Sequence, residues 1–164
     1  MIVRWPDGLQ AGRRCDHLVH FTDWLPTLLA AAGIERHGEL PLDGQDIIPL
    51  LRGEPPDVAP RRFWQWNRYD PLIQCNAAVR DGDWKLVRPV IKEAMYVYPE
   101  DRDLDHIRLL EPDRFTEALP VPDREREIPR PPPPELYNLA DDLEEQHNLA
   151  DAEPDRARRL LREL

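Results

Sequence analysis

Two histidines and two aspartates near the start of the chain are the first residues whose types and spacing invite a chemical interpretation. Asp16, His17, His20 and Asp23 would suit zinc if they met on one face of a helix. Asp23 and Pro26, however, predict a helix that begins only after both histidines, since aspartate is a favoured N-cap and proline is tolerated in a first turn. In an extended segment, His17 and His20 point to opposite sides. We therefore assign these residues surface or capping roles, and no metal ligand.

The common nucleophile and phosphate-binding motifs do not occur in the sequence. The chain contains no serine, which excludes a serine hydrolase. Its seven glycines show no Gly-x-Gly-x-x-Gly spacing, so a nucleotide-binding fold is not supported. Two cysteines are too few for a disulfide scaffold or a four-ligand zinc site, and we expect Cys15 and Cys75 to be reduced, structural thiols. No catalytic residue is assigned.

A dense group of aromatic and polar residues follows a predicted strand in the middle of the chain. Its members are Trp64, Trp66, Asn67, Arg68 and Tyr69. A guanidinium can bind an anion through paired hydrogen bonds, and an aromatic face can pack on a sugar or aryl ring. The alternative is that both tryptophans belong to the core and the other residues form an ordinary loop. The sequence leaves both interpretations open.

Composition limits the class of protein. The chain of 164 residues carries a formal net charge of −10, which disfavours a broad electrostatic hold on nucleic acid. No apolar run approaches the ~18 residues of a membrane-spanning helix, so no membrane span is expected. Nineteen prolines favour loops and short elements over a helical bundle. From its residues alone, the chain is predicted to be an α+β domain.

The first third of the chain is predicted to contain two extended segments, at residues 2–5 and 15–21, and two helices, one of about ten residues after Asp23 and one at 46–52. Asp23 is expected to cap the first helix by accepting a hydrogen bond from the N–H of Leu25. Gly33 is expected to end this helix in the left-handed conformation.

The remainder is predicted to be an antiparallel sheet with one helix. Strands are expected at residues 62–66, 77–80, 83–87 and 135–139, and a helix at 152–164. Asp81-Gly82 predicts a type I′ turn between the second and third strands. Residues 99–134 are polar and punctuated by proline, and the run of four prolines at 131–134 is expected to be extended and solvated.

The order of these motifs resembles the C-terminal portion of a formylglycine-dependent sulfatase of the arylsulfatase family. The series is IVRWPDG at 2–8, DWLPTLLAAAG at 23–33, LDG at 42–44, PLLRG at 49–53, AVRDGDWKL at 78–86, and ELYNL at 135–139 followed by NLA at 148–150. Each motif is weak alone, but the collinear series is specific.

The resemblance implies a fold class and a domain division. It implies α+β architecture, with the C-terminal end of an alkaline-phosphatase-like α/β domain followed by a small antiparallel-sheet subdomain and a packed C-terminal helix. Residues 1–53 would hold the last strand and helices of the truncated catalytic domain, 54–60 a linker, and 61–164 the subdomain, with an insertion at about 90–134.

The resemblance also implies what is missing. The family makes its formylglycine nucleophile from the cysteine of Cys-x-Pro-Ser-Arg, a motif that this sequence lacks. The family's calcium ligands and catalytic lysine have no counterpart either. We therefore expect a C-terminal fragment of an arylsulfatase-like sulfuric ester hydrolase that is inactive alone. Calcium and formylglycine would reside only in a separate N-terminal half, which would be its partner.

This chain would retain only part of the surface that surrounds the bound substrate, which we call the substrate rim. The candidates for contact with a sulfate ester substrate are Asn67, Arg68, Tyr69 and Asn76. The alternative function is a stand-alone, non-catalytic binding or interaction module derived from a sulfatase C-terminal subdomain.

Overall fold

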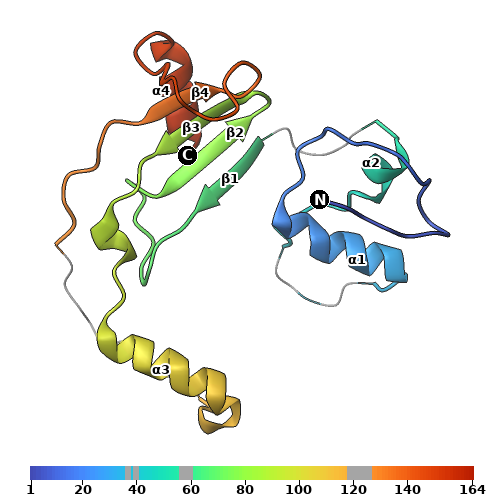
Figure 1. Ribbon diagram of the computed structural model, residues 1–164, viewed down its shortest axis with the longest axis horizontal. Coiled ribbons are helices and arrows are strands. Elements are labelled where there is room, and N and C mark those ends of the chain that lie inside the picture. Colours follow the sequence, from blue (N-terminus) through green and yellow to red (C-terminus); the bar gives the residue numbers. More distant parts are fainter. Residues whose placement is uncertain (36–37, 39–40, 56–60, 118–126) are drawn as a thin grey trace. The chain divides into compact units, whose positions relative to one another are not determined.

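The computed structural model describes residues 1–35, 38, 41–55, 61–117 and 127–164. The chain forms two compact units, Met1–Arg62 and Phe63–Leu164. Helices make up the regular structure of the first unit, and a four-stranded sheet dominates the second (Figure 1). This arrangement confirms the predicted α+β class. Across the described ranges, no helix has the length and apolar character needed to cross a membrane.

Two helices form where the sequence predicts them in the first unit. They are α1 (Trp24–Ala32) and α2 (Ile48–Arg52), the second beginning slightly later than expected. Each ends at a glycine in the left-handed conformation, Gly33 with φ 65° and Gly53 with φ 94°. Glycine adopts this conformation without the steric clash of a Cβ atom, so both helices stop at these positions.

The extended segments predicted before α1 are not strands. Residues 2–5 are irregular, and Ile2 is 97% exposed. The carbonyl of Trp5 instead accepts the N–H of Gly8 at 3.1 Å, which closes a turn. Residues 15–20 are also irregular and lead into a 3-10 turn, η1 (Phe21–Asp23). A strand needs a neighbour for its backbone groups, and none of the described strands pairs with these segments.

Asp23 is the polar centre of the first unit and is completely buried. Its carboxylate accepts the N–H groups of His20 at 2.8 Å and Gln45 at 3.0 Å, and pairs with the Arg62 guanidinium at 3.3 Å. The predicted bond from Leu25 is therefore wrong. Because η1 precedes α1, Asp23 already has helical angles and its side chain reaches back to His20. His20 itself caps η1, which confirms a capping role for this histidine.

The sheet of the second unit has the strand order β1-β2-β3-β4. The strands are β1 (Arg61–Gln65), β2 (Ala77–Asp81), β3 (Trp84–Arg88) and β4 (Glu135–Asn138). β2 pairs antiparallel with β3, and β3 pairs antiparallel with β4. All four strands lie within a residue or two of their predicted positions.

The turn between β2 and β3 differs from the prediction by one residue. Asp81 pairs with Trp84 across the hairpin, so Gly82 and Asp83 are the two loop residues. Only Gly82 has a positive φ, at 62°, whereas a type I′ turn needs positive angles at both loop residues. Asp81 stays in the strand, where its carboxylate accepts a hydrogen bond from Arg159 at 3.0 Å.

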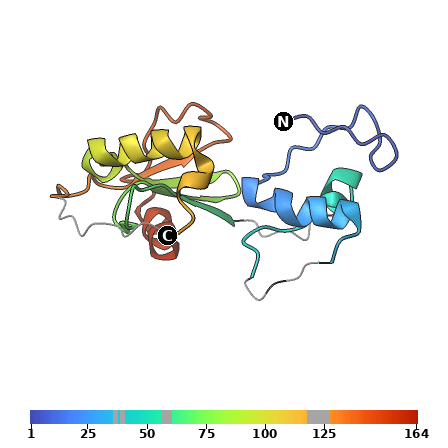
Figure 2. The same cartoon turned by 90° about the horizontal axis from the view of Figure 1, so that it is seen from below.

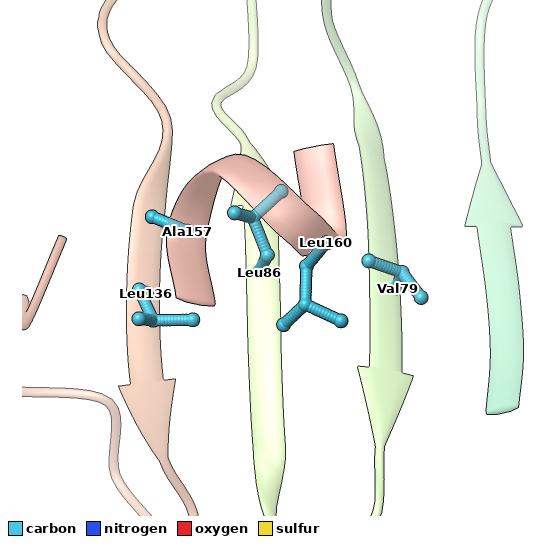
Figure 3. Packing of buried hydrophobic residues seen from close by; sticks show 5 residues of the cluster. All are labelled: Val79, Leu86, Leu136, Ala157 and Leu160. Carbon is cyan, nitrogen blue, oxygen red and sulfur yellow. The ribbon is translucent and has the colours of Figure 1, made fainter. Parts of the chain in front are cut away.

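The core of the second unit lies between the sheet and α4 (Pro154–Glu163). Figure 2 shows α4 against one face of the sheet. The buried side chains come from three strands and from this helix, and Figure 3 shows all five of them: Val79, Leu86, Leu136, Ala157 and Leu160. Burial of each large aliphatic side chain stabilises the fold by about 1.5–3 kcal/mol. This packing confirms the predicted C-terminal helix and its apolar side.

The segment between β3 and β4 contains more helix than its composition predicts. It holds η2 (Lys92–Met95), α3 (Pro99–Leu110) and η3 (Pro112–Arg114). The sequence patterns predict no helix within residues 99–134, so they miss α3. Pro99 occupies the first turn, where proline is tolerated, and no proline follows until Pro112. Residues 118–126 of the predicted insertion, and 56–60 of the predicted linker, lie outside the described residues.

Replacement of Asp23 should destabilise the first unit strongly. Asp23→Ala removes the carboxylate that neutralises the buried Arg62 guanidinium, and breaking a buried ion pair costs about 3–5 kcal/mol. Asp16→Ala is the control, because the Asp16 carboxylate is 73% exposed in its pair with Arg14. Urea unfolding followed through this unit should show a large change in the free energy of unfolding for Asp23→Ala alone. Equal effects of both variants would contradict the role of Asp23.

Tyr137 should make the protein less stable at alkaline pH. Burial and the 2.8 Å hydrogen bond to Glu135 raise the pKa of Tyr137 from 10.0 to about 12. A folded-state pKa above the unfolded value contributes stability that is complete below pH 10.0 and is lost as pH rises towards 12. Tyr137→Phe should reduce this alkaline loss in the free energy of unfolding. Tyr96→Phe, at a half-exposed ring, should behave as the wild type; a similar effect in both would contradict the assignment.

Candidate functional site

The four candidate residues all lie in the connection between β1 and β2, at residues 66–76, which we call the rim loop. Asn67, Arg68 and Tyr69 follow β1, and Asn76 immediately precedes β2. The structure brings two of them together: Nδ2 of Asn76 lies 3.3 Å from Oδ1 of Asn67. Arg68 and Tyr69 are exposed. The candidates therefore divide into an inner amide pair and two outer residues.

Asn76 connects four parts of the second unit. It has a left-handed backbone, with φ 54°, which asparagine tolerates better than most residues. Its carbonyl accepts the N–H of Trp66 at 2.9 Å, and its own N–H donates to Pro89 at 3.3 Å. Its side-chain oxygen accepts the N–H of Ile91 at 2.8 Å while Nδ2 donates to Asn67. Because it makes these contacts and its side chain is almost wholly buried, Asn76 stabilises the fold of the rim loop.

A small apolar cluster lies beneath the rim loop. Cys75, Ile91 and Ala94 are buried, and Leu72 and Ile128 pack against them. Cys75 is a completely buried thiol outside any disulfide, and its Sγ lies 3.8 Å from Oδ1 of Asn67. This environment suits a structural thiol, as predicted for Cys75.

Arg68 and Trp66 form the exposed part of the rim loop. Trp66 is 62% exposed, and the Arg68 guanidinium carbon lies 5.7 Å from the centre of its ring. The backbone N–H of Arg68 donates to the carbonyl of Ala94 at 3.2 Å, which anchors the loop while the side chain extends outward. Among the described residues, Arg68 has no carboxylate partner. The pair can therefore offer a cation and an aromatic face to an anionic ligand that carries a ring.

Tyr69 is exposed, but its hydroxyl is engaged within the protein. The hydroxyl donates to the carboxylate of Asp101 and accepts the N–H of Tyr98 at 3.1 Å. Sequence reasoning missed both partners because they lie far along the chain, at the beginning of α3. The sequence does indicate the helix start, through Pro99 followed by two acidic residues, a common pattern for a first helical turn, but it does not indicate the contact with Tyr69.

The histidines and aspartates near the start of the chain do not assemble into a metal site. His20 contacts Thr22 through Nδ1 at 2.8 Å, Asp16 pairs with Arg14, and Asp23 serves Arg62. Over the parts of the chain that the structure describes, no group of three or more His, Cys, Asp and Glu side chains could hold a metal ion. Neither Cys15 nor Cys75 lies in the motif that yields formylglycine.

An apolar recess of about 370 Å³ lies on the α4 side of the sheet. Its lining consists of Phe63, Trp64, Gln65, Ile73, Ala77 and Leu164. Ile73 is its only contribution from the rim loop, and the four candidate residues do not line it. The recess is therefore separate from the exposed Arg68 and Trp66.

Asn76→Ala should destabilise the second unit by about 2 kcal/mol, because it leaves the buried N–H of Ile91 without its acceptor and strains a left-handed backbone. Gln74→Ala is the control, since Gln74 is exposed in the same loop. Chemical unfolding monitored by tryptophan fluorescence measures both. The role of Asn76 is wrong if the two variants are equally stable.

The comparisons with known proteins agree on a family. Residues 1–110 match the family model described as N-sulphoglucosamine sulphohydrolase, C-terminal. The chain is 30% identical over 158 residues to an ulvan-active sulfatase of Formosa agariphila, a match that covers 91% of this chain and 28% of that protein. It is 42% identical over 53 residues to the steryl-sulfatase of Mus musculus, covering 32% of this chain and 8% of that protein.

Solved structures show the same fold. One comes from work on the metabolism of multiple glycosaminoglycans by Bacteroides thetaiotaomicron, with a TM-score of 0.58 at 21% identity, covering 97% of this chain and 26% of that chain. Another is a complex with its substrate D-glucosamine-2-N,6-O-disulfate, with a TM-score of 0.54 at 19% identity, covering 99% and 27%.

The chain thus spans between about a tenth and about a quarter of the length of the proteins it matches. The matched family model, the sulfatase relatives and the shared fold confirm the resemblance to a C-terminal sulfatase portion. The chain belongs to the sulfatase family described as N-sulphoglucosamine sulphohydrolase, C-terminal.

Proposed function

We propose that this chain is the C-terminal part of an arylsulfatase-like sulfuric ester hydrolase and that it is inactive without an N-terminal half. The family match over residues 1–110 carries this proposal. The match to only 28% of the ulvan-active relative supports it, as does the absence of Cys-x-Pro-Ser-Arg from the sequence. The nucleophile and calcium would belong to the N-terminal half, and this chain would contribute binding and orientation.

Within that enzyme, Arg68 and Trp66 bind the substrate at the rim. The Arg68 guanidinium attracts an anionic group, and the exposed face of Trp66 packs on a ring. We propose a sulfated saccharide as the substrate, because the ulvan-active relative matches most of this chain whereas the steryl-sulfatase match covers 32%. Asn67 and Asn76 hold the loop beneath them, so they act on the substrate only through Arg68 and Trp66.

The N-terminal half docks on an exposed apolar stripe of the first unit. Phe21 is 72% exposed, Leu25 56% and Leu28 61%, and Ala32 is also exposed. Their spacing places them on one side of η1 and α1, the pattern of a helix face that packs against another surface. A stripe this apolar is unusual on a free helix surface, which supports a covering partner.

The test is reconstitution with the N-terminal three quarters of the ulvan-active sulfatase as partner. The purified chain alone should hydrolyse no sulfate ester, with or without calcium. Mixing should protect the amides of α1 from hydrogen exchange and restore hydrolysis of a sulfated oligosaccharide. Hydrolysis of a steroid sulfate instead would correct the substrate class. Turnover by the chain alone would overturn the proposal that the chain is inactive without an N-terminal half.

Leu28→Glu and Leu109→Glu form a matched pair for the docking surface. Both leucines are exposed, at 61% and 78%, but only Leu28 belongs to the stripe. Leu28→Glu should weaken association about tenfold or more, because it removes a leucine from the buried interface. Leu109→Glu should associate as the wild type does. If neither change matters and α1 is already protected in the monomer, the chain is a stand-alone module.

A further inference from the structure

The hydrogen bonds that cap the beginning of α3 come from a residue outside the helix and its N-cap. Tyr98 is the N-cap of α3, and within the described residues its side chain makes no capping hydrogen bond. Asp101 is the third residue of the helix. In a capping box, a carboxylate at this third position would accept the N–H of the N-cap residue directly. Here these two groups do not bond to each other; both bond to the hydroxyl of Tyr69.

The Tyr69 hydroxyl therefore replaces the direct contact of a capping box. It accepts the N–H of Tyr98 at 3.1 Å and donates its own proton to the Asp101 carboxylate. The rings reinforce this geometry, with Tyr69 and Tyr98 centred 5.6 Å apart and Tyr98 and Tyr96 packed edge to face at 5.2 Å. A residue of the rim loop thus completes the first turn of a helix roughly thirty positions further along the chain.

Tyr69 adopts an unfavourable backbone conformation in this position. Its φ is 57°, in the left-handed region that bulky residues rarely occupy. Such conformations persist only where surrounding contacts enforce them, and they cluster at functional sites. The neighbouring residue Arg68 is anchored to Ala94 through its backbone N–H, so the conformation of Tyr69 and the direction of Arg68 are set together.

α3 needs such a cap because it gains little from packing. All of its residues are exposed or half-buried, and Leu109 and Leu110 are 78% and 66% exposed. Helices of this length are marginal in water without tertiary burial. The first turn, where backbone N–H groups lack helical partners, therefore decides whether the helix forms.

We propose that Tyr69 is a positioning residue that caps α3 and thereby makes α3 a wall of the substrate rim beside Arg68. The nature of the ligand, a sulfated saccharide, rests on the proposed function. The capping of α3 by Tyr69 does not depend on it. Without the Tyr69 hydroxyl, the first turn of α3 loses its cap and opens more often, and it no longer responds to a ligand bound at Arg68.

Hydrogen exchange on the full chain tests the capping directly. Tyr69→Phe should lower the protection of the amides at the start of α3 about fivefold, the usual effect of losing a helix cap. Tyr96→Phe is the matched control, since Tyr96 belongs to the same aromatic group but its hydroxyl does not serve the cap. The amide of Leu86 in the sheet core reports whether the fold persists. Unchanged protection of α3 in Tyr69→Phe overturns the proposal.

Two changes at Asp101 provide a second route if Tyr69→Phe disturbs the sheet. Asp101→Asn keeps an acceptor oxygen for the Tyr69 hydroxyl and should retain most of the protection, whereas Asp101→Leu should lose it. Equal protection in the two variants overturns the proposal, because a general effect of removing charge would not separate them.

Titration with D-glucosamine-2-N,6-O-disulfate, followed by nuclear magnetic resonance, tests the coupling. In the wild type, signals of the Arg68 side chain and of the Asp101 amide should shift together, and in Tyr69→Phe only those of Arg68. A shift at Arg68 that never reaches Asp101 overturns the positioning role. No shift at Arg68 contradicts the proposed function, while the exchange experiment still decides the capping.

Discussion

Asn76 is the constraint on which the rim loop depends. It immediately precedes β2, and its backbone and side chain bond to residues that follow β1 and to residues that follow β3. Its left-handed backbone directs β2 into the sheet while its amide faces the buried N–H of Ile91. Because the amide pair and Cys75 fill the space below, the exposed residues Arg68 and Tyr69 stand on a rigid base.

Polar contacts of this kind recur in both units. In the first unit, the completely buried carboxylate of Asp23 joins η1, the segment before α2 and Arg62. In the second, the amide oxygen of Asn148 accepts the N–H groups of Leu136 and Ala150, which ties β4 to the loop before α4. Short elements joined by long loops thus obtain fixed geometry from side chains that satisfy backbone groups.

Local signals made most of the elements predictable from the sequence. Glycine at the left-handed positions predicted both helix ends, and alternation with Asp-Gly predicted the hairpin, because these effects act over a few residues. The partner of Asp23 and the contacts of Tyr69 were not predictable, since Arg62 and Asp101 meet them only through the tertiary fold. α3 was missed because the proline-rich average of its segment hid a stretch free of proline. The collinear motifs, in contrast, were sufficient to indicate the family.

The register of β3 and β4 has a consequence for how this protein can vary. Val87 and Glu135 stand directly opposite each other, so the long segment between them is, in topological terms, the loop of a hairpin. The entropic cost of closing such a loop rises slowly, by about 0.6 kcal/mol for each doubling of its length. Insertions and deletions beyond Ala94 therefore leave the core of Leu86 and Leu136 intact. Evolution can exchange this segment, and with it the shape of the surface beside Arg68, at little cost to folding.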